Sequence, residues 1–371
     1  MRVAIVHDYL TQFGGAERVL LALMEAFENA PVFTLLHNGR VMPAGFDEAR
    51  IRVSFLQRVP GAKRHHRFFP LLMPLAVEQF DFSEYDVVLS DTHSFTKGII
   101  TGASTMHLSY CFTPTRYLWD DSHRYVREFS RLALFKPLAP LGLSYMRLWD
   151  YYAAQRVDSY LTLSQVVARR IKKYYHRDSR VVPPPVDVDD FKVSKETGGY
   201  YLVVSRLVPY KRVELAIEAC ERLKRPLKIA GTGQDYESLR KRGGEYVEFL
   251  GFVPDEQLPQ LYAGCRALLF PQEEDFGITP LEAAAAGKPT VAYAGGGALE
   301  TVVADETGVF FEEQTVTSLM GAILRLEQKN FDPELIRRHA EKYRRQNFLR
   351  AIREEVQNQW MVYQKENSVR L

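Results

Sequence analysis

Short apolar runs alternate with longer amphipathic stretches along the first half of the chain. Val3–Val6 is a continuous apolar run, typical of a strand buried on both faces, and a polar loop ending in Gly14-Gly15 follows it. A helix is predicted over residues 16–27 and a second strand over residues 31–36. The apolar face of that helix consists of Val19, Leu20, Leu23 and Phe27. This order of strand, glycine loop, helix and strand requires a parallel sheet. Further strands are predicted in this half at Val87–Ser90, His107–Tyr110 and Tyr160–Leu163.

A second alternation of the same kind begins at Tyr200–Val204 and continues into a helix with one apolar face. The apolar face of that helix consists of Val213, Ala216, Ile217, Cys220 and Leu223. From about Pro333 to the end, the chain is predicted to be helical. Further strands are predicted at Leu227–Ala230, Tyr246–Leu250, Ala267–Phe270, Thr290–Tyr293 and Gly308–Phe311. The pattern predicts an α/β chain with two Rossmann-like parallel-sheet domains that face each other across a cleft.

The chain length agrees with two domains, because 371 residues exceed what one ordinary core holds. The run Pro183-Pro184-Pro185 ends the first half, and the polar residues that follow include the pair Gly198-Gly199. We predict an N-terminal domain over residues 1–185 and a linker over 186–199. The second domain spans 200–345, and a final helix over 346–371 packs back on the N-terminal domain.

Composition excludes several classes of protein. The formal net charge of +2 gives no global field for binding nucleic acid. Cys111, Cys220 and Cys265 are odd in number and widely spaced, which indicates a reducing compartment without disulfides or a zinc site. No signal-peptide core follows Met1-Arg2, and no apolar run approaches the roughly 20 residues of a membrane span. We therefore expect a cytoplasmic protein.

Two segments of the first half, residues 61–80 and 131–149, mix basic residues with apolar and aromatic ones. Basic residues beside exposed apolar ones are typical of proteins that bind an anionic membrane surface. Core or interdomain helices with solvated basic ends would show the same composition. The sequence leaves both interpretations open.

The loop after Tyr200–Val204 carries two candidate anion-binding residues just before a helix. Arg206 offers a planar fork of donors and Lys211 a point charge, a pair that suits two adjacent phosphates. Cations at a helix N-terminus are unfavourable unless an anion joins them. A solvated basic loop is the alternative interpretation.

Glycines at other strand ends give weaker signals. Gly14-Gly15 allows backbone N–H groups to approach an anion at a helix N-terminus, and Gly295–Gly297 again permits close approach of the backbone. Gly231-Thr232-Gly233 is more typical of an ordinary turn. Phe252 offers an aromatic edge for a base, although ordinary packing explains it equally well.

The stretch from Glu273 to Glu282 holds two candidate ligand-binding carboxylates, Glu274 and Glu282, at a strand, loop and helix corner, where open α/β sheets bind ligands. Thr279 as N-cap, Pro280 and Glu282 have the form of a capping box at a helix start. Glu274 then falls in the loop ahead of the helix, where its carboxylate can accept hydrogen bonds from sugar hydroxyls. Glu282 is explained equally well by the capping box and by a ligand.

Over nearly the whole chain these residues resemble the retaining glycosyltransferases of family 4, which have the GT-B fold with a C-terminal helix that returns to the first domain. Glu274 and Glu282 resemble the paired-glutamate motif of that family, and Ser205–Lys211 resembles its phosphate-binding segment. Other segments are similar to those of the WbaZ-type bacterial mannosyltransferases. These are His7–Leu10, Gly14–Arg18 and Tyr110–Asp120.

The resemblance implies a role for each matching residue. Arg206 and Lys211 would hold the donor diphosphate and stabilise the leaving group without a metal, and Glu282 would bind the ribose hydroxyls. Glu274 would contact the donor sugar. The other donor-binding positions would be Gly15, Phe252, Phe276, Gly277, Ile278 and Thr279. The family often places a histidine near the anomeric carbon, but the matching strand position carries Phe112, so His93 is the candidate.

The activity implied is retaining transfer of a hexose, with mannose and GDP-mannose favoured, to a lipid-diphosphate-linked saccharide in O-antigen or exopolysaccharide synthesis. The donor domain would be the C-terminal one and the acceptor side the N-terminal one, with no cofactor and with peripheral association at the inner face of a bacterial membrane. A UDP-sugar-dependent enzyme of the same fold and a non-catalytic nucleotide-sugar-binding protein are the alternatives.

Overall fold

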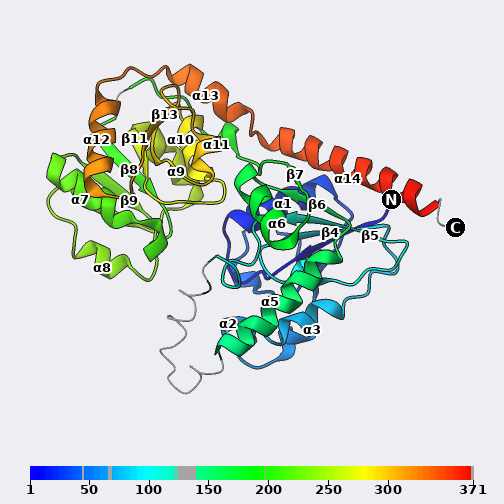
Figure 1. The fold of residues 1–371 in the computed structure, drawn as a ribbon. Coiled ribbons are helices and arrows are strands. Elements are labelled where there is room, and N and C mark those ends of the chain that lie inside the picture. Colours follow the sequence, from blue (N-terminus) through cyan, green and yellow to red (C-terminus); the bar gives the residue numbers. More distant parts are fainter. Residues whose placement is uncertain (44–45, 66–68, 121, 123–138, 197, 369–371) are drawn as a thin grey trace. The chain divides into compact units, whose positions relative to one another are not determined.

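The computed structural model describes the chain except residues 44–45, 66–68, 121, 123–138, 197 and 369–371 (Figure 1). Parts of the two basic and apolar segments, including Arg131 and Lys136, lie outside the described residues. The chain forms two compact units. Unit 1 is Met1–Pro183 with Phe348–Leu371, and unit 2 is Pro184–Asn347. The acceptor and donor roles of the two domains stay predictions.

Unit 1 contains a seven-stranded sheet of order β3-β2-β1-β4-β5-β6-β7, in which all the paired strands are parallel. Its strands are β1 (Val3–His7), β2 (Val32–Thr34), β3 (Ile51–Val53), β4 (Val87–Thr92), β5 (Met106–Cys111), β6 (Ser159–Thr162) and β7 (Arg180–Val181). Strand order reverses between β1 and β4, where His7 is opposite Asp91. The carboxyl ends of these two strands therefore form the switch point at which such sheets bind ligands.

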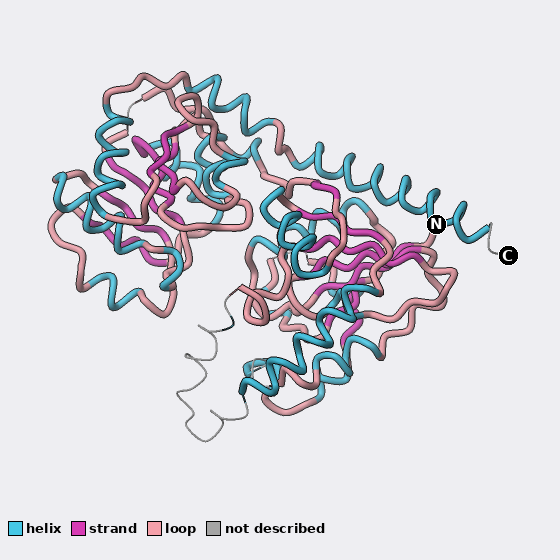
Figure 2. Tube along the Cα trace, in the orientation of Figure 1, coloured by secondary structure: helices cyan, strands magenta, loops and turns pink. Residues whose placement is uncertain are grey.

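Helices flank this sheet (Figure 2). They are α1 (Gly15–Ala26), α2 (Ala62–His65), α3 (Met73–Glu78), α5 (Ala139–Gln155), α6 (Gln165–Tyr175) and α14 (Arg345–Ser368). Short 3₁₀ turns are η1 (Gly39–Val41), η2 (Glu48–Arg50), η3 (Phe55–Arg58) and η5 (Thr96–Gly98). The Ser164 hydroxyl accepts the Val167 N–H and so caps the start of α6.

The C-terminal helix α14 packs on unit 1, as the family resemblance predicts. Its apolar face buries Phe348, Ile352 and Val356, and the Phe348 ring meets Tyr110 at 6.0 Å between centroids. Arg353 donates to the carbonyls of Ala26 at 3.0 Å and Glu25 at 3.1 Å. Because these carbonyls end α1, the guanidinium satisfies acceptors that the helix itself leaves open.

Unit 2 contains a six-stranded parallel sheet of order β10-β9-β8-β11-β12-β13. Its strands are β8 (Tyr200–Val204), β9 (Leu227–Ala230), β10 (Val247–Gly251), β11 (Cys265–Phe270), β12 (Thr290–Tyr293) and β13 (Gly308–Phe311). Its helices are α7 (Val213–Leu223), α8 (Tyr236–Arg240), α9 (Leu258–Gly264), α10 (Ile278–Ala285), α11 (Ala298–Thr301), α12 (Val316–Glu327) and α13 (Pro333–Glu341). The 3₁₀ turns are η7 (Val188–Asp190), η8 (Pro209–Lys211) and η9 (Asp255–Gln257). The prediction of two Rossmann-like parallel-sheet domains is confirmed.

Candidate active site

The loop after β8 holds the two predicted cations of unit 2 in different environments. Arg206 is exposed, and its guanidinium donates to the Tyr210 hydroxyl at 3.3 Å. Lys211 is mostly buried, and its ammonium forms an ion pair with the Glu274 carboxylate. The Gln272 amide donates to the same Glu274 oxygen at 3.0 Å. The structure therefore joins Lys211 directly to Glu274, and it leaves Arg206 open to a ligand anion.

The helix that follows Glu274 does not begin as the sequence predicts. Gly277, not Thr279, is the N-cap of α10, and its φ of +96° lies in the left-handed region that favours glycine. No side chain within the described residues caps this end. The capping box is therefore wrong, and the N–H groups of Ile278 and Thr279 fall in the first turn, where an anion can accept from them.

Glu282 lies in the second turn of α10 and is buried. Its carboxylate accepts the Tyr262 hydroxyl of α9 at 2.6 Å. A neighbouring helix thus fixes Glu282, so the local capping explanation for this residue no longer holds.

Gly231 and Gly296 pack closely against the backbone of the loops that carry Arg206 and Glu274. The sequence did not reveal this role. A Cβ added at Gly231 would lie 1.8 Å from the Ser205 carbonyl oxygen, and one at Gly296 would lie 2.3 Å from the Glu274 carbonyl oxygen. The Gly297 N–H also donates to the Glu274 carbonyl at 2.7 Å. These glycines let other parts of the protein backbone approach closely. A larger residue at either loop would displace the Arg206 or the Glu274 segment.

Phe252 follows β10 and takes no part in the contacts described for Lys211, Glu274 and Glu282. Its side chain is 76% exposed, so ordinary packing does not explain it. Gly251 before it has a φ of +68°, which turns the chain sharply at the end of the strand. Phe252 is thus free of the core, and its predicted role toward a base stays a prediction.

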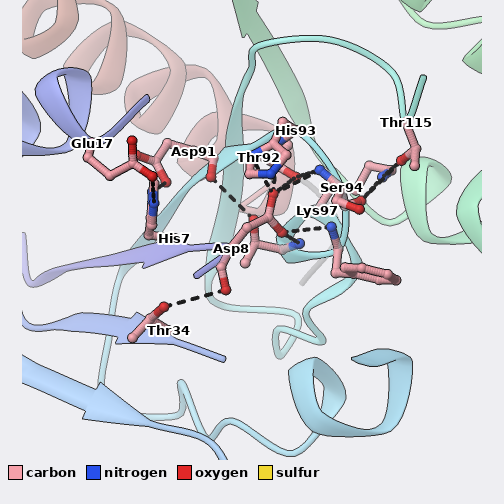
Figure 3. A network of polar contacts seen from close by, with 12 residues as sticks. His7, Asp8, Glu17, Thr34, Asp91, Thr92, His93, Ser94, Lys97 and Thr115 are labelled. Atoms are coloured by element: carbon pink, nitrogen blue, oxygen red, sulfur yellow. Dashed lines mark hydrogen bonds and ion pairs between the residues drawn. The ribbon is translucent and has the colours of Figure 1, made fainter. Parts of the chain in front are cut away.

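In unit 1, polar residues gather at the ends of β1 and β4 (Figure 3). His93 is partly exposed and its ring nitrogen Nδ1 lies 3.2 Å from the buried Asp8 carboxylate. Phe112 is buried against Tyr110, with 5.5 Å between ring centroids. Gly15 begins α1, and the buried Glu17 carboxylate lies in that first turn. Of the sequence candidates in unit 1, His93 thus lies at the switch point.

In the same cluster, the fully buried His7 lies with its Nδ1 2.7 Å from the Asp91 carboxylate and its other ring nitrogen 4.0 Å from Glu17. Burial opposes protonation of His7, but Asp91 and then Glu17 and Asp8 outweigh it and raise the pKa of His7 to about 9. His7 is therefore charged at neutral pH and balances this acidic cluster.

The stability of unit 1 should fall as the pH rises above neutrality. An imidazole that titrates near 6.5 when unfolded and near 9 when folded stabilises fully below pH 6.5, and this stabilisation is lost as the pH rises through about 9. Tryptophan fluorescence reports unit 1, because Trp119, Trp149 and Trp360 all lie in it. We expect the urea midpoint followed in this way to decline toward pH 9, and Asp91→Asn to flatten that decline. A slope that Asp91→Asn leaves unchanged would contradict the assignment.

No group of His, Cys, Asp and Glu side chains suited to a metal ion occurs among the residues the structure describes. The three cysteines are free and buried. Burial raises the pKa of each thiol to about 12. These thiols are therefore core residues.

Family models match both halves of the chain. The model of glycosyl transferases group 1 matches residues 187–346, and that of glycosyltransferase family 4 matches residues 13–190. In sequence, the chain is 24% identical over 287 residues to the alpha-1,3/1,6-mannosyltransferase ALG2 of Dictyostelium discoideum, covering 64% of this chain and 66% of that protein. It is 31% identical over 207 residues to the O-antigen chain mannosyltransferase B of Escherichia coli, covering 51% of each.

A third relative is the GDP-mannose-dependent alpha-(1-6)-phosphatidylinositol monomannoside mannosyltransferase of Mycolicibacterium smegmatis. It is 32% identical over 172 residues, which cover 38% of this chain and 45% of that protein. The chain thus spans between about half and two thirds of the length of these relatives.

Solved structures share the fold over nearly the full length. The Anabaena protein HepE in complex with UDP has a TM-score of 0.71 and 18% identity, covering 96% of this chain and 100% of its own. The sucrose-phosphate synthase of Thermosynechococcus elongatus has a TM-score of 0.73 and 16% identity, with full coverage of both chains. With both family models matched across residues 13–346, the chain belongs to the family 4 glycosyltransferases and has their GT-B fold.

Proposed function

We propose that the protein is a retaining, metal-independent mannosyltransferase that uses GDP-mannose and extends a lipid-diphosphate-linked saccharide in O-antigen or exopolysaccharide synthesis. The observation that carries this proposal is the ion pair between Lys211 and Glu274, beside an exposed Arg206 on the same loop as Lys211. The names of the relatives support the sugar, since three of them are mannosyltransferases, one of which is called GDP-mannose-dependent.

The two cations of unit 2 suit a diphosphate leaving group. Arg206 and Lys211 together supply two positive charges against the charge that develops on the departing phosphate. The amides of Ile278 and Thr279 in the first turn of α10, those of Phe276 and Gly277 just before it, and the amide of Gly15 would contact phosphate or sugar oxygens. Because Arg206 and Lys211 supply the positive charge that would otherwise come from a metal ion, the proposal requires no metal ion.

The two glutamates would hold two different parts of the donor. Glu282, fixed by Tyr262, would accept hydrogen bonds from the ribose hydroxyls. Glu274 would give up part of its ion pair with Lys211 and contact the hexose. The exposed Phe252 side chain would contact the base. The acceptor hydroxyl would attack the face from which the diphosphate leaves, and the departing phosphate would help to remove its proton. His93 would lie close to the anomeric carbon.

The full-length purified protein, incubated with a panel of nucleotide sugars and a lipid-diphosphate-linked saccharide, tests the proposal. We expect transfer from GDP-mannose, an α-linked product by NMR that shows retention, and unchanged rates in the presence of a chelator. Tight binding of nucleoside diphosphates without hydrolysis of, or transfer from, any donor would instead make the protein a non-catalytic binding protein.

An exposed apolar surface on unit 1 suits a lipid-linked acceptor. Four large apolar side chains of α5 are more than half exposed: Leu141, Tyr145, Leu148 and Tyr152, which recur every three or four residues along one helical stripe. Leu71 and Leu75 add exposed apolar surface at α3, which α5 contacts through the 3.0 Å hydrogen bond from Trp149 to Glu78. Arg58 and Lys63 are exposed basic residues earlier in the same unit. We propose that this surface lies against an anionic bilayer.

The described residues include no helix long and apolar enough to cross a membrane. Binding to lipid vesicles tests the membrane-surface proposal. We expect the double variant Tyr145→Ser/Leu148→Ser to bind phosphatidylglycerol-containing vesicles at least about tenfold more weakly, because each lost apolar side chain costs roughly 1.5–3 kcal/mol of burial. Leu324→Ser, at an exposed leucine of unit 2, is the matched control and should not change binding. Equal binding by all three proteins would exclude α5 from the membrane surface.

A further inference from the structure

Asp8 stands out in unit 1 because both of its carboxylate oxygens are directed at one loop (Figure 3). It follows β1 directly and is fully buried. One oxygen accepts the N–H groups of His93 and Ser94, each at 2.8 Å. The other accepts those of Phe95 at 2.7 Å and Thr96 at 2.9 Å. A single side chain therefore satisfies four consecutive backbone donors of the loop that follows β4.

These contacts favour a charged carboxylate in a buried place. Burial would raise the pKa of Asp8, but His93, the backbone N–H groups and Lys97 outweigh it and lower the pKa. Asp8 is thus ionised at neutral pH, and an ionised carboxylate can only accept hydrogen bonds. All its neighbours in the loop must therefore donate to it.

The same requirement fixes the ring of His93. Its Nδ1 lies 3.2 Å from the Asp8 oxygen, and because a carboxylate can only accept, Nδ1 is the nitrogen that carries a proton; in the uncharged form of the ring, Nε2 is then the acceptor. The Tyr9 ring meets the His93 ring edge to face, with 5.3 Å between centroids and 85° between planes. Asp8 and Tyr9 together leave the imidazole little freedom to rotate, although 34% of the His93 side chain is exposed.

We propose that Asp8 is a positioning residue of the transfer reaction, whose carboxylate fixes the backbone of residues 93–96 and holds His93 as the Nδ1–H tautomer. The inference rests on the proposed function, because His93 acts on the donor sugar only if the protein is a transferase. Asp8 itself does not touch the sugar. Its effect on the rate passes through the orientation of His93, for which a wrong tautomer would be as harmful as a missing ring.

Asp8→Asn tests the proposal, since the amide keeps the shape of the carboxylate but one of its two positions becomes a donor that faces backbone N–H groups. We expect kcat to fall about tenfold to hundredfold, by analogy with the loss of carboxylates that orient metal-bound histidines. The Kd for the nucleoside diphosphate should change less than twofold, because Arg206 and Lys211 belong to unit 2. ¹⁵N NMR of labelled histidine, with His93→Ala to assign the signal, should show Nδ1–H in the unaltered protein and loss of that tautomer in Asp8→Asn.

A double-mutant cycle separates positioning from mere stability. In the His93→Ala background, Asp8→Asn should cause no further loss of kcat, because the residue it positions is already gone. Asp158→Asn is the matched control: this carboxylate accepts one backbone N–H, that of His107, at 2.7 Å, and it should leave kcat and the His93 signal unchanged.

The outcomes of the cycle are distinct. Additive losses of kcat, or an Nε2–H tautomer in the unaltered protein, would overturn the positioning role and leave the proposed transferase standing. The tautomer measurement holds even if Asp8→Asn does not fold. Full activity of His93→Ala would also overturn the inference. An unaltered protein that transfers from no donor would remove the proposed function itself.

Discussion

Replacing Lys211 by alanine should lower kcat by about 10²- to 10³-fold, the loss typical of removing one group that stabilises transition-state charge. The ammonium lies beside Glu274 on the loop that follows β8, and the proposed reaction builds negative charge on a diphosphate at this place. Arg206→Ala should cause a loss of similar size without lowering stability, because its side chain is exposed and its described partner is the Tyr210 hydroxyl. Steady-state kinetics with the donor and calorimetric binding of the nucleoside diphosphate measure both effects.

The unfolding of unit 2 provides the check on Lys211→Ala. Lys211 and Glu274 are only 12% and 24% exposed, so losing this ion pair should cost more than the about 1 kcal/mol of a surface pair and less than the about 3–5 kcal/mol of a fully buried one, as measured by thermal unfolding followed by circular dichroism. Lys228→Ala is the matched control. It removes the same charge from unit 2 at an ion pair with Glu248 of 3.2 Å, and it should keep kcat. Near-normal rates for both Arg206→Ala and Lys211→Ala would remove the diphosphate assignment.

Glu274→Ala distinguishes a sugar contact from a simple counter-ion for Lys211. If Glu274 contacts the hexose, its loss impairs turnover and leaves nucleoside diphosphate affinity largely unchanged. If it served only to neutralise Lys211, its loss would free the ammonium and tighten diphosphate binding without lowering kcat. Because Glu274 forms an ion pair with Lys211, turnover and diphosphate affinity must both be measured to separate the two roles.

Most of the inner strands, and the edge strand β13, could be predicted from the sequence because they consist mainly of apolar residues that the sheet buries. The bounds of β1, β4 and β5 in unit 1, and of β8, β9, β12 and β13 in unit 2, agree with the prediction to within two residues. Two edge strands, β3 and β7, were missed. They have three and two residues and expose Arg52 and Arg180, so they show no apolar run.

The charged residues of unit 2 could be identified from the sequence, but their pairing could not. Lys211 and Glu274 are far apart in the chain and meet because β8 pairs with β11, which places the loops after both strands side by side. The contact of Tyr262 with Glu282 likewise depends on how α9 packs beside α10. Strand order and helix packing are long-range properties that local patterns do not contain.

The start of α10 was predicted wrongly because two local signals compete. Thr279 and Pro280 have the form of a cap and first helical residue, but Gly277 can adopt a left-handed φ and starts the helix earlier. Pro280 is still tolerated, since the first-turn N–H groups of a helix have no partner within it. Asp8 was hidden for another reason: its four N–H donors follow β4, which lies next to β1 only in the folded sheet.

Asp150→Ala should destabilise unit 1 by about 3–5 kcal/mol, the cost of leaving one member of a buried ion pair without its partner. Asp150 lies 2.6 Å from the Lys97 ammonium, and both side chains are 1% exposed. The same carboxylate accepts the hydroxyls of Thr115 at 2.6 Å and Tyr175 at 2.9 Å, and the Trp119 indole N–H at 2.8 Å. Its removal therefore leaves the buried Lys97 ammonium with only the neutral Ser94 carbonyl and Thr115 hydroxyl as acceptors, and it takes an acceptor from three neutral donors.

Urea unfolding followed by tryptophan fluorescence measures this loss in unit 1, since the three tryptophans all belong to that unit. Asp178→Ala is the matched control, because it breaks the exposed 2.7 Å pair with Lys172 in the same unit and should cost less than about 1 kcal/mol. Lys97→Met should cost less than Asp150→Ala, as the carboxylate would keep its three neutral donors. Equal, small losses for Asp150→Ala and Asp178→Ala would mean that water reaches Lys97 and takes the place of the Asp150 carboxylate.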